Sequence, residues 1–185
     1  MVWLFETRQD WWRKATSKVE GIDYGETFAP VARLESIRML LAYASHHDFK
    51  LQQMDVKSAF LNGPLNELLH VKQPQGFKDP KLPNHVYKLK KVLYSLKQAP
   101  RVWYEHLNKL LQDHGFEIGK IDLTLFTKRV KGDLFICQLY VDDIIFGSPN
   151  KSFNDYFTAL MTEKFEMSMM GELKFLLGFK VKKRR

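Results

Sequence analysis

Three aspartates from two distant segments are the residues best suited to chemistry. Asp142 and Asp143 lie between two apolar runs in LFICQLYVDDIIFG, residues 134–147, and Asp55 lies in QQMDVKSAF. Carboxylates are costly to place beside an apolar interior unless something neutralises them. A pair of aspartates alone is typical of a tight turn, where the side chain bonds its own backbone. Turn chemistry does not explain Asp55, which lies near the end of an apolar run of its own.

If the two segments form neighbouring strands, their acids meet at one edge of a sheet. Mutual repulsion then raises the pKa values of the carboxyls unless a cation is shared. Mg²⁺ is the cation expected, because it binds carboxylate oxygens and completes its shell with water and phosphates. Two such ions, about 3.5 to 4 Å apart, can stabilise the attacking and leaving oxygens of a phosphoryl displacement. The sequence therefore predicts a divalent-metal site for a polyphosphate substrate, and it shows neither zinc-ligand spacing nor a Gly-rich phosphate loop.

Length and composition indicate one compact domain, or one with a small subdomain, because 185 residues with 45% hydrophobic content can bury a real core. Lysine and arginine number 29 against 21 acids, a net charge of +8. Such an excess favours polyanions, of which nucleic acid is the commonest. The alternative is a solvated basic surface without a partner, and the basic residues are spread along the chain.

The expected location is intracellular, in the cytoplasm or the nucleus, and the protein is not expected to be secreted. No apolar run is long enough to cross a bilayer, so no membrane partner is expected. The first residues, MVWLFETRQDWW, lack the features of a secretory signal. Cys137 is the single cysteine and fits a reducing compartment.

Periodicity and turn signals predict alternating helices and strands. A helix is expected over SIRMLLAYASHH, and another begins at Pro100 and ends before Gly115. Strands are expected in KLQQMDVKSAFL, in LLHVKQPQGF with its loop, and in HVYKLKKVLY. A hairpin with a Gly-Asp turn joins TLFTKRV to LFICQLYV, and VDD forms a second turn into IIFG. Ser152 is expected to cap a last helix, FNDYFTALMTEKF, with Asp155 as its capping-box partner. The fold class expected is α+β, with an antiparallel sheet and helices packed on one face.

The longer motifs resemble one family, the reverse transcriptases of copia-type LTR retrotransposons, which are parts of Pol polyproteins. The resemblance covers about residues 21–179. Its stretches are GIDYGETFAPVARLESIRMLLAYASHHDFKLQQMDVKSAFLNG, VYKLKKVLYSLKQAPRVWYEHL, QLYVDDIIFGS and FEMSMMGELKFLLG. The order of the three motif groups is highly specific, whereas VDD alone would be a weak signal.

This resemblance implies a right-hand polymerase with palm and fingers. The fingers would comprise about residues 21–50 and 63–95, and the palm about 51–62 and 96–179, followed by a basic tail, 180–185. The implied activity is RNA-directed DNA synthesis: a primer 3′-hydroxyl attacks the α-phosphate of a dNTP and expels pyrophosphate. The implied partners are an RNA or DNA template with its primer, and the cofactor is two Mg²⁺ ions, for which Mn²⁺ can substitute.

The resemblance also assigns roles to individual residues. Asp55 and Asp142 would ligate the two ions, with Val56 as a further ligand and Asp143 as the supporting acid. Phe60 would be the steric gate that excludes a ribose 2′-hydroxyl, although a plain core aromatic remains an alternative. The other expected contacts are to the nucleotide for Lys97, Gln98 and Tyr140, to the primer and template for Arg101, and to the primer for Leu177 and Gly178. For the last two, a closing core hairpin is the alternative.

The sequence departs from the family pattern in three places. Ser95 stands where the family usually has glycine, and the chain stops at Arg185, before any thumb, connection or RNase H region. Residues 1–20 form an aberrant N-terminus where the family has a basic fingers strand. Because tryptophan has one codon, Asp10-Trp11-Trp12-Arg13 can be written so that a one-base shift encodes Leu-Val-Ala of that strand. Residues 1 to about 17 are therefore interpreted as an out-of-frame product, with a divergent N-terminus as the alternative.

Three functions are weighed on these grounds. The first is an RNA-directed DNA polymerase domain that is fragmentary but retains its catalytic acids. The second is a relic without turnover that at most binds nucleic acid through its charge. A third, another palm-type nucleotidyltransferase or cyclase, is disfavoured by KSAFLNG and LKQAPRVWY.

Overall fold

The chain forms two compact units. The computed structural model describes residues 26–65, 69–176 and 179–181. One unit, called here the hairpin unit, comprises Met1–Ala29 and Phe60–His106, and the other, the sheet unit, comprises Pro30–Ala59 and Leu107–Arg185. The predicted aberrant N-terminus, residues 1–20, lies outside the described ranges, and so do residues 182–185 of the predicted basic tail.

The sheet unit is built on a six-stranded antiparallel sheet in the order β4-β5-β6-β7-β1-β8. Its strands are β1 (Gln52–Val56), β4 (Glu117–Ile118), β5 (Leu125–Val130), β6 (Asp133–Tyr140), β7 (Asp143–Gly147) and β8 (Met167–Glu172). A separate two-stranded sheet pairs β9 (Phe175–Leu176) with β10 (Phe179–Lys180). The predicted mixed fold with an antiparallel sheet is confirmed, and β1 and β7 are neighbours as the spacing of the acids required.

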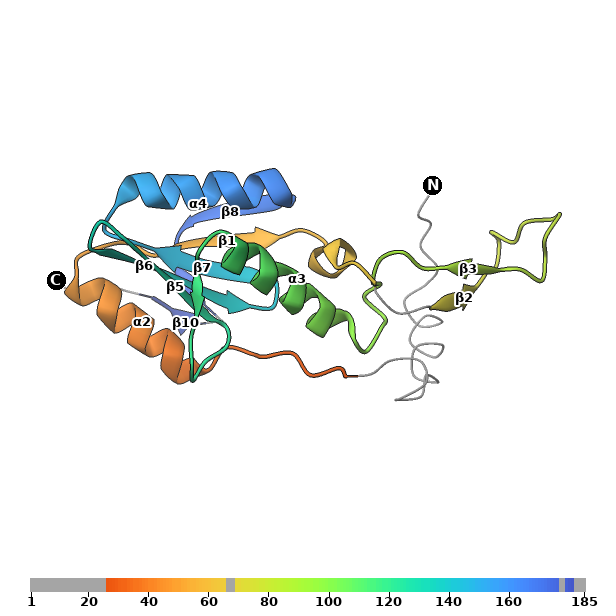
Figure 1. Cartoon of the computed structure of the whole chain (residues 1–185), viewed down its shortest axis with the longest axis horizontal. Coiled ribbons are helices and arrows are strands. Elements are labelled where there is room, and N and C mark those ends of the chain that lie inside the picture. Colours follow the sequence, from red (N-terminus) through yellow and green to blue (C-terminus); the bar gives the residue numbers. More distant parts are fainter. Residues whose placement is uncertain (1–25, 66–68, 177–178, 182–185) are drawn as a thin grey trace. The chain divides into compact units, whose positions relative to one another are not determined.

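Helices cover both faces of this sheet, so the prediction that they pack on one face is wrong. Helix α2 (Leu34–His46) shares a buried cluster with Ile136 and Ile145. Helix α4 (Lys151–Lys164) contacts the alternate positions, because the Phe157 ring lies 5.0 Å from Phe135 and 4.8 Å from Phe146. Neighbouring residues of a strand point to opposite faces, and Figure 1 shows the two helices on opposite sides of the sheet.

Two tight turns connect the central strands. Lys131 and Gly132, both at positive φ, join β5 to β6, so the turn precedes the Gly-Asp pair that the sequence predicts by one residue. Val141 and Asp142 join β6 to β7, with Val141 at φ 58°. Positive φ suits two-residue hairpin turns but is costly for a β-branched residue such as valine.

The hairpin unit has a small core of its own. It contains the 3₁₀ helix η1 (Ala59–Asn62) from Phe60 onward, the hairpin of β2 (His70–Lys72) with β3 (Val86–Lys88), and the first half of helix α3 (Ala99–Asp113). The buried residues are Leu69, Leu89, Val92, Leu96 and Ala99. Gly63 allows close packing here, because a Cβ would lie 2.8 Å from Cγ1 of Val102.

For the remaining elements, the sequence predicts the type of element better than its ends or its caps. Helix α3 ends before Gly115, which has the positive φ of 77° typical of a helix C-terminus. The predicted cap is wrong: α4 begins at Lys151 after Asn150, Ser152 lies within the helix, and Asp155 pairs with Lys151 at 2.9 Å. Strands β4 and β8 were not predicted. No helix among the described residues is long and apolar enough to cross a membrane.

Candidate active site

Strand pairing brings the predicted acids together at one end of the sheet. Asp55 lies directly opposite Asp143 in the β1–β7 pair, and opposite positions of antiparallel strands have Cβ atoms about 4.5 to 5.5 Å apart. Asp142 occupies the adjoining turn, and its carbonyl oxygen accepts the Val56 N–H at 3.0 Å. That bond fixes the turn against the end of β1. The prediction that Asp55 meets the Asp142–Asp143 pair at a sheet edge is therefore confirmed.

The pKa of Asp55 records this proximity. Burial raises the pKa of Asp55 above its ordinary value, the charges of Asp142 and Asp143 raise it further, and Lys57 lowers it. The net direction is upward, as the sequence predicts for acids that repel one another. The one lysine in this balance is itself bound, since Lys57 Nζ lies 3.0 Å from Glu166 Oε1. The acids thus retain a repulsion that an added cation would relieve.

The site has side chains suited to binding a metal ion, but it does not have a complete set of protein ligands. Within residues 26–65, 69–176 and 179–181, no three His, Cys, Asp or Glu side chains are gathered into a group ready to hold a metal ion. The donor set itself is right for Mg²⁺, because hard oxygen atoms from one or two carboxylates, completed by water and phosphate, are what this ion takes. The residues present therefore fit a divalent ion that is held jointly with a substrate.

Two residues at the site were missed by the sequence analysis. Gln53 Nε2 donates to Asp143 Oδ1 at 2.9 Å and so orients that carboxylate. The signal was available, because Gln53 precedes Asp55 by two positions and lies on the same face of β1. Val141 is the other, since strained backbone angles cluster at functional turns and its φ is visible only in the structure.

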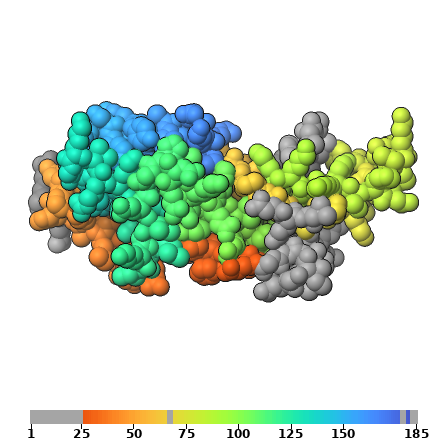
Figure 2. Space-filling model, in the orientation of Figure 1, coloured from red at the N-terminus to blue at the C-terminus, as the bar shows by residue number. Residues whose placement is uncertain are grey.

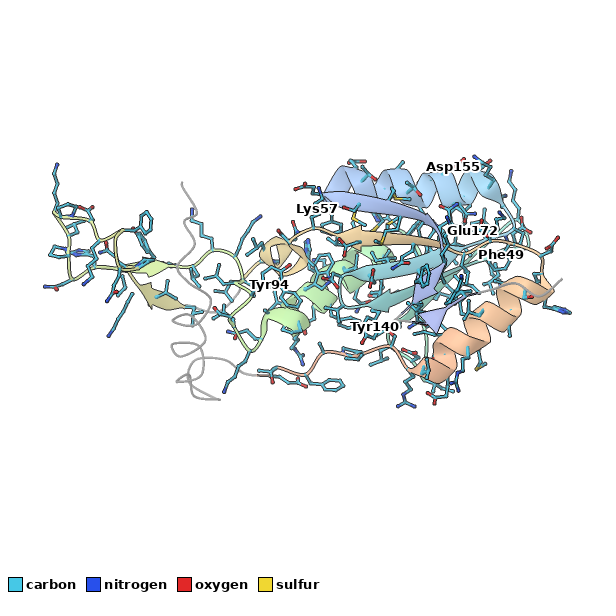
Figure 3. All side chains as sticks on the ribbon, turned by 180° about the vertical axis from the view of Figure 1, so that it is seen from behind. Phe49, Lys57, Tyr94, Tyr140, Asp155 and Glu172 are labelled. Atoms are coloured by element: carbon cyan, nitrogen blue, oxygen red, sulfur yellow. The ribbon has the colours of Figure 1, made fainter. Side chains whose placement is uncertain are left out.

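Ion pairs bracket the strand that carries Asp55. Lys50 Nζ lies 2.6 Å from Glu172 Oε2, and Lys57 pairs with Glu166. Figure 3 shows Lys57 and Glu172 toward opposite ends of the β1–β8 pair. A register shift between Gln53 and Met54 interrupts this pair, and such bulges are frequent beside active sites because they re-aim side chains. Strand β6 borders β7 on the side away from β1. There Tyr140, which is predicted to contact the nucleotide, lies opposite Asp143.

The predicted residues of the hairpin unit are placed as follows. Phe60 is half-buried, and its ring centroid lies 4.7 Å from that of Tyr94, a half-exposed side chain. Lys97 is exposed, whereas Gln98 is only 2% exposed. Arg101 is held by two carboxylates, Glu26 at 2.5 Å and Glu105 at 2.8 Å. Gln98 and Arg101 are thus less open to a ligand than the sequence predicts.

The remaining predicted site residues, Leu177 and Gly178, lie outside the described residues. The flanking strands β9 and β10 pair antiparallel, with Leu176 opposite Phe179. This strand pairing agrees with the closing-hairpin alternative, and the primer contacts stay predictions.

Comparison with known proteins now identifies the chain. The sequence pattern of the family described as "Reverse transcriptase (RNA-dependent DNA polymerase)" matches residues 12–185. The chain belongs to this reverse transcriptase family, and the match begins upstream of Gly21, where the visible resemblance starts.

Its relatives are polyproteins of copia-type transposons. The chain is 36% identical over 170 residues to the "Retrovirus-related Pol polyprotein from transposon RE1" of Arabidopsis thaliana, covering 92% of this chain and 12% of that protein. It is 35% identical over 173 residues to the Pol polyprotein from transposon TNT 1-94 of Nicotiana tabacum, covering 93% of this chain and 13% of the relative. The chain thus spans about an eighth of these relatives. No solved structure matches it.

Proposed function

We propose that this chain is the polymerase portion of a retrotransposon Pol polyprotein and acts in RNA-directed DNA synthesis. The observation that carries the proposal is the placement of Asp55 opposite Asp143 and beside the turn that holds Asp142. Membership of the reverse transcriptase family supports it. The proposed substrates are a dNTP and a primer annealed to an RNA or DNA template.

The acids have distinct proposed roles. Asp55 and Asp142, with Val56, would hold two divalent ions, Mg²⁺ or in its place Mn²⁺, and Asp143 would support them. When bound, such ions neutralise charge that develops on the attacking and leaving oxygens. The chain's own contribution is rigidity: β1 and β7 fix the acids, and the Gln53 amide holds the Asp143 carboxylate in one orientation. The reaction would form a bond from the primer 3′-oxygen to the α-phosphorus and break the bond from that phosphorus to the oxygen bridging to the β-phosphate. Pyrophosphate would leave with the bonding electrons, and the 3′-hydroxyl proton would pass to solvent.

The nucleotide and primer contacts remain proposals of the same kind. Phe60 would act as the steric gate, Lys97, Gln98 and Tyr140 would contact the nucleotide, and Arg101 would contact the primer–template. Leu177 and Gly178 would contact the primer. Lys97 is an exposed residue, and a lysine ammonium is suited to a triphosphate because charge-assisted bonds to phosphate are strong.

We further propose a right-hand architecture of palm and fingers, with the fingers at about 21–50 and 63–95 and the palm at about 51–62 and 96–179. The two compact units divide the chain at other points, after Ala29, Ala59 and His106. Helix α2 in particular packs on the six-stranded sheet. Limited proteolysis would locate the functional boundary, since cleavage concentrates in exposed segments between compact parts.

The second candidate function is a relic that binds nucleic acid without turnover. The ion pairs of Arg101 with Glu26 and Glu105, and the burial of Gln98, favour it. The interpretation of residues 1–17 as an out-of-frame product points the same way. Sequencing the gene tests the out-of-frame interpretation. That interpretation requires the shifted reading frame to encode the basic fingers strand of the family.

Primer extension on an RNA template with Mg²⁺ separates the two candidates. The polymerase proposal predicts nucleotide incorporation by the wild type, and its loss in Asp142→Asn. Asp133→Asn is the matched control, because Asp133 lies at the start of β6, beside the other turn. Absence of incorporation by the wild type, with template binding retained, would establish the relic.

A further inference from the structure

One ion pair of the sheet unit lies beside the acids of the candidate site. Lys57 Nζ lies 3.0 Å from Glu166 Oε1, and of the described residues Glu166 alone forms an ion pair with Lys57. The backbones are joined as well, because the Lys57 N–H donates to the Glu166 carbonyl oxygen at 2.9 Å. Val56 lies opposite Met167, so this bond continues the β1–β8 pairing by one position. The pair is thus fixed at the end of β1 that carries Asp55.

The Lys57 ammonium could reach Asp55 if Glu166 released it. Lys57 follows Asp55 by two positions, so their backbones lie at most about 7 Å apart, a distance that a lysine side chain can span. The lysine acts on Asp55 even from its present position. Burial raises the pKa of Asp55 most, the charges of Asp142 and Asp143 add to the rise, and the charge of Lys57 lowers it. Lys57 is therefore a cation that can compete with a metal ion for Asp55.

Both members of this ion pair are exposed, so water screens their attraction. The side chains of Lys57 and Glu166 are 52% and 75% exposed, and ion pairs of this kind contribute little to stability. Figure 2 shows the blue atoms of α4 and of the segment after it at the surface. The main effect of the pair is therefore on where the Lys57 ammonium lies.

We propose that Glu166 is a positioning residue that holds the Lys57 ammonium away from Asp55 and so leaves the acids open to a divalent ion. The inference rests on the proposed function, for which it names the ion pair that sets the affinity for the ion. Without Glu166, the ammonium would turn to Asp55 and compete with the ion for the same carboxylate. Without Lys57, the repulsion among the acids would favour the ion more strongly.

Mn²⁺ binding in the absence of nucleotide tests the inference without catalysis. Electron paramagnetic resonance measures the free ion during a titration, and the binding that is lost in Asp142→Asn defines the ions at the site. Lys57→Gln, Glu166→Gln and the double variant are compared with the wild type. Each substitution keeps the backbone hydrogen bond between the two residues, and circular dichroism would confirm that each variant folds.

The two single variants should change Mn²⁺ affinity in opposite directions. Lys57→Gln should bind roughly threefold more tightly and Glu166→Gln roughly threefold more weakly, because water and salt screen charges near a surface. The double variant should behave like Lys57→Gln, since Glu166 has nothing to hold once the lysine is gone. Residues that acted independently through their charges would instead give the product of the two single effects. That product, or a single variant without the expected change, would overturn the inference.

The ion pair of Lys50 with Glu172 is the matched control. It is also exposed, with 2.6 Å between Nζ and Oε2, and Figure 3 shows Lys57 and Glu172 toward opposite ends of the β1–β8 pair. Lys50 precedes Asp55 by five positions, roughly 17 Å of extended chain, which exceeds the Debye length of about 8 Å at physiological ionic strength. Lys50→Gln and Glu172→Gln should therefore leave Mn²⁺ binding unchanged.

Two further outcomes would overturn the inference. One is a change in the control variants as large as that at Lys57 and Glu166. The other is a wild type whose Mn²⁺ binding equals that of Asp142→Asn. Failure of the proposed function is a different result, because it would appear as absent primer extension by the wild type.

Discussion

The sheet unit and the hairpin unit differ in the size of their cores and in how they place charged side chains. The sheet unit holds acids close together, and it does so with a large core in which aromatic rings from α4, β6 and β7 pack against one another at tilted angles of 46°. The hairpin unit spreads cations over an exposed surface above a core of five buried residues. Placing like charges together requires a rigid scaffold, whereas displaying charges to solvent requires mainly exposure. Stability and charge are therefore expected to respond separately to mutation in the two units.

Phe157→Ala should give the largest effect. The ring is fully buried between Phe116, Phe135 and Phe146, so its removal leaves a cavity and should lower the free energy of unfolding by about 3 to 5 kcal/mol. Urea unfolding measures the loss, and amide exchange locates it. Amides of β6 and β7 should lose protection and those of β2 and β3 should not. Equal loss in the β2–β3 hairpin would contradict the division into units.

Val92→Ala makes the reciprocal test in the hairpin unit. Val92 is fully buried, and truncation should cost about 2 kcal/mol locally, from two methyl groups and the cavity they leave. Exchange protection should fall in β2 and β3 and stay unchanged in β6. Val31→Ala is the control, since that side chain is 58% exposed and its loss should change stability by less than about 0.5 kcal/mol.

Val141→Gly should show that the turn beside the acids is strained. Glycine tolerates the φ of 58° that costs an L-residue roughly 1 to 2 kcal/mol. The change should leave the free energy of unfolding unaltered or raise it by up to about 1 kcal/mol. Val130→Gly, in the same sheet but at ordinary strand geometry, should instead lower it by about 1 kcal/mol. A loss of equal size at both valines would show that the turn stores no strain.

Asp55→Asn should have the smallest effect, and its sign depends on pH. Because the folded-state pKa of Asp55 is raised, protonation favours folding, and the stability that it supplies is lost as pH rises through the folded-state pKa. Asparagine does not ionise, so the substitution removes the loss of stability that accompanies ionisation of Asp55. Near pH 7 the variant should be more stable than the wild type, by less than about 1 kcal/mol since solvent screens the site. The gain should vanish near pH 3, and a gain independent of pH would contradict the repulsion.

Local signals were enough to predict the acids and their strands. Alternating apolar residues and two-residue turns identify β5, β6 and β7, and Asp55 stands out because its strand has no other reason for a carboxylate. The pairing of β1 with β7 followed once both were strands of one sheet. What the family motifs added was the order of these segments and their roles.

Other features depend on partners distant in sequence. A side chain at position 147 would crowd its neighbours, because a Cβ there would lie 2.9 Å from the Lys50 carbonyl oxygen, a contact that no local pattern records. The Arg101–Glu26 ion pair spans two segments far apart in the chain. Strand β4 has two residues, and β8 contains the sequence MSMMGE, whose glycine and weak alternation hide a strand. Coverage of both sheet faces likewise depends on where α2 packs.

Cation binding beside Asp55, Asp142 and Asp143, completed by a bound nucleotide, is the central claim, and thermal unfolding with added Mn²⁺ or Mg²⁺ in the presence of a dNTP tests it most directly. A ligand that binds only the folded state raises the melting midpoint with concentration. The wild type and the Asp133→Asn control should both gain stability as either ion is added, and Asp142→Asn should gain none. A midpoint that does not move in the wild type, or that rises equally in Asp142→Asn, would contradict a shared metal site at the meeting of β1 and β7.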